Sequence, residues 1–143
     1  MNKCPRHIQQ YAKKLTNNNK YFEWEEDEYH LQYSVKCTCG NEAFEIIGDE
    51  DFTTIAKCTE CKNEIILYDL RLYPAAIHIE CDKKPIRYIT KDGDTIFNVA
   101  VHYEYSQLYE DEEFNPDDIT WCIIRVYGLK SNKIFEILDD ETA

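Results

Sequence analysis

The sequence predicts a mainly β protein, a β-rich α+β fold in which we expect only one or two helices. Apolar and polar residues alternate through 95–105, where Phe97, Val99 and Val101 share one face. This pattern is typical of an antiparallel strand with one solvated side. Turn-forming sequences such as KDGD at 91–94 separate several short apolar stretches. With 143 residues, of which 43% are hydrophobic, the chain is long enough to bury one core.

The first predicted element is a short amphipathic helix at residues 5–16. Pro5 suits the first turn of a helix, and a stripe of apolar residues begins at Ile8 and follows at helical spacing. Residues 1–20 carry five basic and no acidic side chains, whereas the rest of the chain carries 11 basic and 28 acidic ones. A basic helix can contact phosphate or a membrane surface, but here we expect it to dock on the acidic body.

An acidic and aromatic connector, YFEWEEDEYH at 21–30, completes a predicted N-terminal region of residues 1–32. Strand-like stretches follow in the next forty residues. They are YSVKC at 33–37, a stretch around Phe44 and Ile46, FTTIAKC at 52–58 and EIILYDL at 64–70. A polar turn, GDED at 48–51, joins the second of these to the third as a hairpin.

Four of the seven cysteines lie in two short turn sequences. Cys37 and Cys39 occur in CTCGN, Cys58 and Cys61 occur in CTECKN, and eighteen residues separate the two pairs. Each pair ends a strand-like stretch. Gly40 follows the first pair and Asn63 follows the second, and both residue types tolerate a positive φ. Two such turns brought together give a tetrahedral four-sulfur site, which zinc accepts at about 2.3 Å per bond.

The segment from Tyr33 to Leu70 resembles a zinc ribbon, although its first turn is C-x-C rather than C-x2-C. The resemblance implies a ribbon domain at residues 33–73 in which four cysteines hold one structural Zn²⁺. These ligands are Cys37, Cys39, Cys58 and Cys61. A closed four-thiolate site leaves no open position for catalysis, and no histidine lies within six residues of the four cysteines. The alternative is a redox pair, but such motifs begin helices and these flanks predict strands.

The other three cysteines have no comparable spacing. Cys122 lies in the strand-like run ITWCIIRVYG, where we expect it to pack in the core. Cys81 is expected at a strand end. A second metal site formed by Cys4, Cys81 and His78 stays open as an alternative to separate packed or exposed residues.

Residues 74–143 predict an antiparallel sheet of about four to five strands, packed on the ribbon as one compact body. The clearest hairpin joins IRYIT at 86–90 to TIFNVAVHYEY at 95–105 through the Asp-Gly turn. Shorter strands are predicted at 75–80, 119–128 and 133–138. His102 is expected on the solvated face near Glu104 as a surface residue.

Composition excludes several function classes. Four unclustered glycines rule out a phosphate-binding loop, and no G-x-S-x-G sequence occurs. We therefore expect no enzyme. The net charge of −12 disfavours a generic nucleic-acid binder. No apolar run is long enough to cross a membrane, and seven cysteines without an export signal favour a reducing, cytoplasmic location.

The acidity predicts a protein-binding module for a basic partner, in one form an inhibitor or immunity-type protein. Aromatic residues beside acidic ones are the expected anchors. They are Trp24, Tyr103, Tyr105 and Tyr109. The alternative is a nucleic-acid-associated accessory factor of transcription or translation that binds through its basic residues. These form one group at Lys36, Lys57 and Lys62 and a second at Lys83, Lys84 and Arg87.

Overall fold

The computed structural model confirms a mainly β fold, with strands joined in one open antiparallel sheet. It describes residues 4–16, 18–23, 30–49, 52–72, 80–105 and 115–141. Nine strands occur in these ranges: β1 Ala12–Lys14, β2 His30–Val35, β3 Phe44–Ile47, β4 Thr53–Cys58, β5 Glu64–Asp69, β6 Glu80–Lys83, β7 Phe97–Glu104, β8 Trp121–Gly128 and β9 Ile134–Glu141. The described helices are short: α1 Ile86–Thr90 and two 3-10 turns, η1 Gln9–Tyr11 and η2 Leu70–Leu72. None of them could span a membrane.

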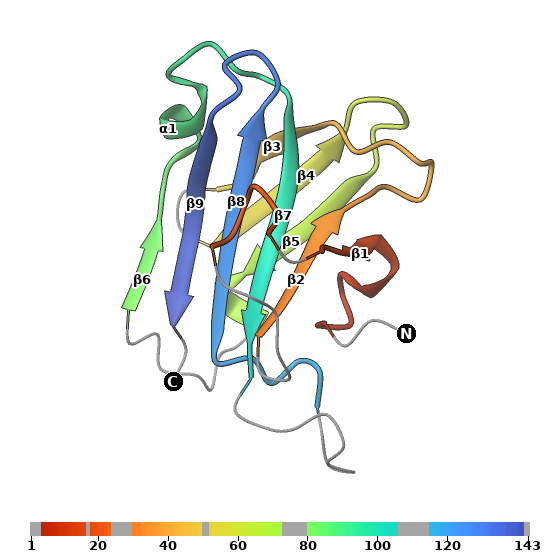
Figure 1. The fold of residues 1–143 in the computed structure, drawn as a ribbon, viewed down its shortest axis with the longest axis vertical. Coiled ribbons are helices and arrows are strands. Elements are labelled where there is room, and N and C mark those ends of the chain that lie inside the picture. The colour runs from red at the N-terminus through yellow and green to blue at the C-terminus, as the bar shows by residue number, and fades with distance from the viewer. Residues whose placement is uncertain are drawn as a thin grey trace.

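Strand β7 occupies the centre of the sheet, whose order is β5-β4-β3-β7-β8-β9-β6 (Figure 1). One edge of β7 pairs with β8 along its whole length. The other edge is shared, because β2 pairs with residues 100–104 and β3 pairs through Phe44 opposite Phe97. The strands that carry the cysteine turns are therefore joined to the C-terminal strands by backbone pairing.

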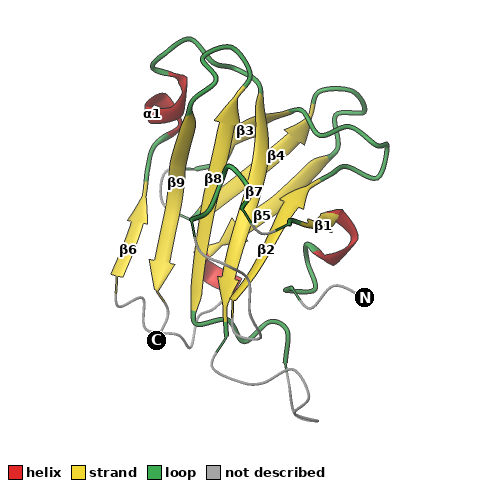
Figure 2. Cartoon of the chain, in the orientation of Figure 1, coloured by secondary structure: helices red, strands yellow, loops and turns green. Residues whose placement is uncertain are grey.

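The sheet folds back on itself, so that β3, β4 and β5 lie behind β7, β8 and β9 (Figures 1 and 2). A buried hydrogen bond links the two layers, with the Tyr68 hydroxyl of β5 donating to Asp140 Oδ2 of β9 over 2.7 Å. Apolar side chains from both layers fill the space between them, among them Phe44, Leu67 and Val101, none of which is exposed. The main hydrophobic core lies between these layers.

The prediction of a helix at residues 5–16 is wrong. Only η1 forms there, and Ala12–Lys14 pairs with Tyr33–Val35 as strand β1. An isolated helix of this length is marginal in water, whereas the edge of β2 offers a ladder of backbone partners. The expected docking does occur. Cys4 and Ile8 are fully buried, and the Arg6 guanidinium pairs with Asp117 at 2.7 Å.

His7 in this docked segment makes unfolding pH-dependent. Burial lowers its pKa below the usual 6.5, although the Leu67 carbonyl and Asp117 act in the opposite direction. Folded His7 therefore stays neutral at a pH where the unfolded chain binds a proton, so stability is lost as the pH falls. We expect urea unfolding to show a steeper loss of stability below about pH 6.5 in the wild type than in His7→Gln. Parallel curves for the two proteins would contradict this assignment.

The predicted strand at residues 86–90 is also wrong, because this stretch forms helix α1. Ile86 and Ile89 are three residues apart, so a single helical turn directs both toward the core, and Ile89 is fully buried. Pro85 is the N-cap residue and has an extended backbone, so the helix begins at Ile86. The Asp-Gly turn thus joins α1 to β7 instead of closing a hairpin. Most of the strand predicted at 75–80 lies outside the described residues, and β6 begins at its last position.

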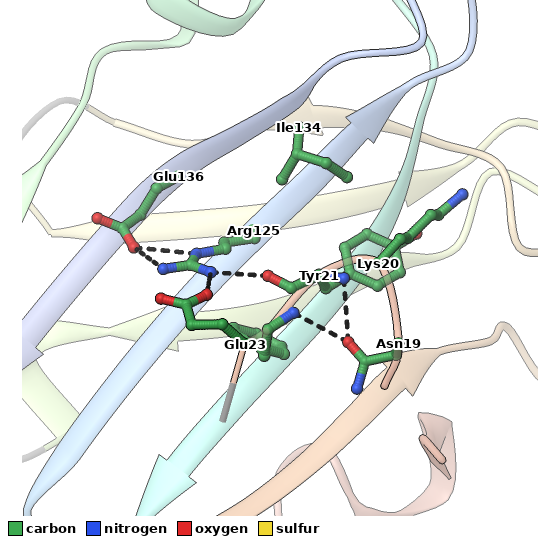
Figure 3. Close-up of a pocket in the computed structure, with 8 residues that line it drawn as sticks. Asn19, Lys20, Tyr21, Glu23, Arg125, Ile134 and Glu136 are labelled. Carbon is green, nitrogen blue, oxygen red and sulfur yellow. Dashed lines mark hydrogen bonds and ion pairs between the residues drawn. The ribbon is translucent and has the colours of Figure 1, made fainter. Parts of the chain in front are cut away.

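A segment that we call the strap, residues 19–23, covers the outer face of β7 and β8, so this face is not exposed to solvent there. Arg125 of β8 holds it in place: its Nη1 donates to the Tyr21 carbonyl at 2.7 Å and to Glu23 Oε2 at 2.9 Å (Figure 3). Its Nε and Nη2 contact Glu136 Oε1 of β9, each at 3.1 Å. These groups line an open hollow of about 510 Å³. Each of the three guanidinium nitrogens contacts an acceptor oxygen, so Arg125 holds the strap on the sheet.

Candidate metal centre

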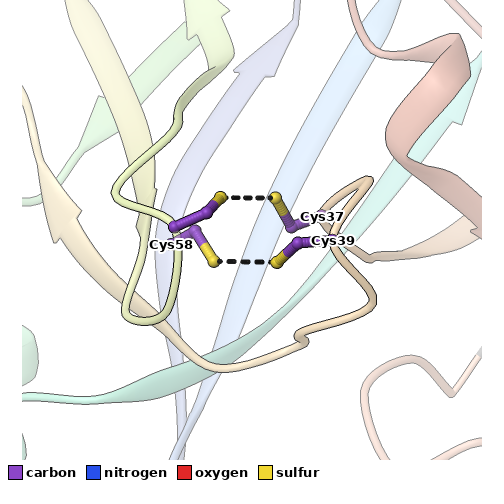
Figure 4. Close-up of side chains that lie close together, drawn as sticks. Cys37, Cys39 and Cys58 are labelled. Carbon is purple, nitrogen blue, oxygen red and sulfur yellow. Dashed lines mark hydrogen bonds between the residues drawn. The ribbon is translucent and has the colours of Figure 1, made fainter.

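The structure brings Cys37, Cys39, Cys58 and Cys61 together at one point (Figure 4). All four Sγ atoms lie within 4.8 Å of one another. Two of the distances run between the two turns: 3.5 Å from Cys37 to Cys61 and 3.6 Å from Cys39 to Cys58. A tetrahedral ion at about 2.3 Å from each sulfur would place the sulfurs about 3.8 Å apart. The cluster therefore has the size that a single tetrahedral metal ion needs.

Backbone hydrogen bonds fold each cysteine pair into a tight turn. In the first turn, between β2 and β3, Gly40 N donates to Cys37 O at 2.9 Å and Gly40 has a φ of 97°. In the second, between β4 and β5, Lys62 N donates to Cys58 O at 3.1 Å. The positive φ, 67°, falls on Lys62 and not on the asparagine that follows it, which corrects the predicted position. Each turn directs its two thiols into the space between the turns.

Asn41 joins the two turns and was not recognised in the sequence. Its Nδ2 donates to Cys58 Sγ at 3.3 Å, to Thr59 Oγ1 at 2.9 Å and to Ala43 O at 2.8 Å. The same side chain accepts a hydrogen bond from Ala43 N through its Oδ1. Its place directly after CTCG is the signal that could have identified it, since asparagine is common where side chains stabilise turns.

The environment of Cys58 favours its thiolate. Desolvation raises the pKa of Cys58, but hydrogen bonds from Asn41 and from the N–H groups of Cys61 and Glu60 outweigh it and lower the pKa to about 6. Cys61 differs. The N–H of Asn63 lowers its pKa, but the neighbouring thiols and desolvation outweigh that effect and raise it to about 12. Thiolates at these distances repel one another. Ionisation of all four cysteines therefore requires a bound cation.

The distances also bear on the redox alternative for Cys58 and Cys61. Cys61 lies 3.5 Å from a sulfur of the opposite turn and Cys58 lies 3.6 Å from one, and both cysteines are free. Their flanks are strands β4 and β5 rather than the start of a helix. The arrangement therefore favours a shared ion over a local dithiol pair.

Other predicted residues take different places. Cys122 is buried in the core as expected, Cys4 is buried and Cys81 is exposed. Within the described ranges, the four-cysteine cluster is the sole group of His, Cys, Asp and Glu with donor atoms close enough to share an ion. His78 lies outside those ranges, so the second site is not tested.

Two of the four predicted aromatic anchors are buried. Tyr103 is fully buried and Tyr105 is 2% exposed, so both rings pack in the core. Trp24 and Tyr109 lie outside the described residues.

His102 is buried too, contrary to the expected surface position. Its ring lies 5.4 Å from the ring of Phe22 in the strap and 5.7 Å from that of His30. Alternation along β7 placed His102 on the correct face, but the strap that covers this face comes from far away in the chain.

Comparisons with known proteins give no relative for this chain. No family model, no curated protein and no solved structure matches it. The four-cysteine cluster is thus the feature from which a function has to be argued.

Proposed function

We propose that the four cysteines bind one zinc ion whose role is structural. The observation that carries this proposal is the mutual distance of the four Sγ atoms, none above 4.8 Å. Four sulfur ligands in a tetrahedron are typical of zinc or of iron, and zinc suits a closed site without redox function. The ion would fix the β2–β3 and β4–β5 turns to each other, next to the point where β3 pairs with β7.

The second part of the proposal is that the protein binds a basic protein partner through its acidic surface. Its net charge is −12, and four bound thiolates with one Zn²⁺ would leave the metal centre negative as well. Exposed carboxylates surround the cysteine turns, namely those of Glu42, Glu45, Glu60 and Glu64. Such a field speeds the encounter with a cationic protein. An inhibitor or immunity-type protein that covers a basic enzyme is one form of this function.

The nucleic-acid alternative loses support at Lys57, one of the three lysines beside the cysteines. Lys57 of β4 lies in register between Glu45 of β3 and Glu64 of β5. Cross-strand neighbours of opposite charge neutralise each other at short range. A phosphate group that approached Lys57 would therefore meet two carboxylates as well.

Elemental analysis of the purified protein tests the metal assignment, and we expect about one zinc per chain. For the partner, immobilised protein should retain basic proteins from an extract of the source cells and release them as the salt concentration rises. The variant Glu45→Lys/Glu64→Lys should retain less, whereas Glu141→Lys on β9 should behave as the wild type. Iron in place of zinc would overturn the metal identity, and retention independent of salt would overturn the acidic surface.

A further inference from the structure

One end of the molecule has a charge opposite to that of the whole protein. This end, the basic tip, consists of residues 83–96 and 128–133, which contain six basic and two acidic side chains. The basic ones are Lys83, Lys84, Arg87, Lys91, Lys130 and Lys133. The tip includes α1, the loop to β7 and the β8–β9 turn, which lie together at the top of Figure 1. Its positive charge therefore comes from two segments distant in sequence.

Contacts hold the positive groups of the basic tip close to one another. Lys84 and Lys91 both place their ammonium groups over the ring of Tyr88, at 5.8 and 4.4 Å. Lys130 Nζ lies against Gly93, where a Cβ would be 3.2 Å from it. Lys84 pairs with Asp82 at 3.2 Å and Lys133 pairs with Asp92 at 3.1 Å. Among the described residues, no carboxylate forms an ion pair with Lys91, Lys130 or the exposed Arg87. The tip thus presents cations that remain available to an anion.

Two large aliphatic side chains are exposed beside these cations. Ile96 is 37% exposed and Leu129 is 42% exposed, and Leu129 N donates to Ile96 O at 3.1 Å. Together with Gly93, Thr95 and Lys130 they line a hollow of about 260 Å³. This hollow has room for one apolar side chain and has a cation at its rim.

The basic tip is preorganised by the buried Asp94. This carboxylate accepts hydrogen bonds from Lys130 N and Ser131 N, each at 2.9 Å, and from the Ser131 hydroxyl. It packs so closely on Gly128 that a Cβ there would lie 2.3 Å from Asp94 Oδ2. A binding surface that is already ordered loses little conformational entropy when a ligand binds.

We propose that the basic tip binds an acidic peptide segment that carries one apolar anchor residue. The anchor enters the hollow between Ile96 and Leu129, and carboxylates on either side pair with Arg87, Lys91 and Lys130. The positive charge suits any anionic ligand, and the aliphatic lining of the hollow favours this peptide over nucleic acid. Single-stranded nucleic acid needs exposed aromatic platforms, and the one ring of the tip, Tyr88, is covered by two ammonium groups.

The net negative charge of the protein does not prevent this binding. At physiological salt, charges separated by more than about 8 Å are largely screened, so the local field of the basic tip governs an approaching peptide. The residues of the basic tip are also different from the four glutamates around the cysteine turns. The chain would then present two surfaces of opposite sign to two different partners.

Calorimetric titration of the full chain with a short Asp- and Glu-rich peptide that has one central leucine tests the proposal. We expect Leu129→Ser and the double variant Arg87→Glu/Lys91→Glu each to weaken binding about tenfold or more. Matched controls exist elsewhere on the surface. Ile66→Ser on β5 and Lys13→Glu/Lys14→Glu on β1 make the same chemical changes and should leave the affinity unchanged.

A peptide whose leucine is replaced by serine should bind about tenfold more weakly than the parent peptide. Equal affinity for the two peptides, equal loss in the control variants, or stronger binding of duplex DNA or anionic vesicles would each overturn the proposal. Circular dichroism of every variant establishes that it is folded before titration. The test uses the full chain as purified, and none of the substituted residues belongs to the cysteine cluster. A failure of the metal assignment in elemental analysis and a failure of peptide binding are therefore distinguishable.

Discussion

Replacing Cys58 by serine is expected to abolish metal retention and to unfold at least the β3–β5 layer. Structural zinc contributes about 10–16 kcal/mol of apparent binding free energy in small zinc peptides at neutral pH, which matches or exceeds the total stability of a typical domain. Cys58 is the last residue of β4, fully buried and in register with Phe44. Loss of its thiolate would therefore affect both the metal and the strand that bears it.

Cys81→Ser is the control, because Cys81 is an exposed cysteine outside the cluster. It should keep about one metal ion per chain and the wild-type circular dichroism spectrum. A chelator should convert the wild type to the state of the Cys58 variant. Acid should act in the same direction, since ligand thiols must lose their protons to bind metal. A Cys58→Ser protein that retains a full equivalent of metal would remove Cys58 from the ligand set.

The cysteine cluster could be predicted because its signal is local. Two cysteine pairs at turn-like spacing, each after a strand-like stretch, were enough to place four thiols at one point. The sequence could indicate Asn41 as a turn residue but not its partners across the gap. Its role depends on Thr59 and Cys58 lying across the gap between the turns, and that distance is set by the pairing of β3 with β4.

The errors in the predicted fold share a physical cause, which is contact with residues distant in the sequence. Residues 5–16 have helical spacing, but the edge of β2 supplies backbone partners that a short helix cannot match. IRYIT at 86–90 alternates like a strand, yet tertiary packing of Ile86 and Ile89 makes it helical. The strap over His102 depends on Arg125, more than a hundred positions from Tyr21. Local patterns contain no information about such partners.

Phe44→Ala is expected to have the second-largest effect, a loss of about 3–5 kcal/mol in the free energy of unfolding. Phe44 is fully buried and stands in register with Cys58 on one side and Phe97 on the other. It is the residue through which β3 pairs with β7, so a cavity there would weaken the joint between the layers. Urea unfolding of the zinc-loaded protein measures the change.

Phe52→Ala provides the matched control, because Phe52 is 43% exposed and contacts Arg71 at the surface. Its effect should stay within about 0.5 kcal/mol of the wild type. If the proposed zinc ion is bound, Phe44→Ala should also release it to a chelator faster than the wild type, since Phe44 is in register with Cys58, the last residue of β4. If Phe44→Ala lowers stability without changing zinc release, the metal centre is held by its own turns and Asn41 alone. Equal destabilisation by the two variants would instead show that Phe44 is not part of the joint between the layers.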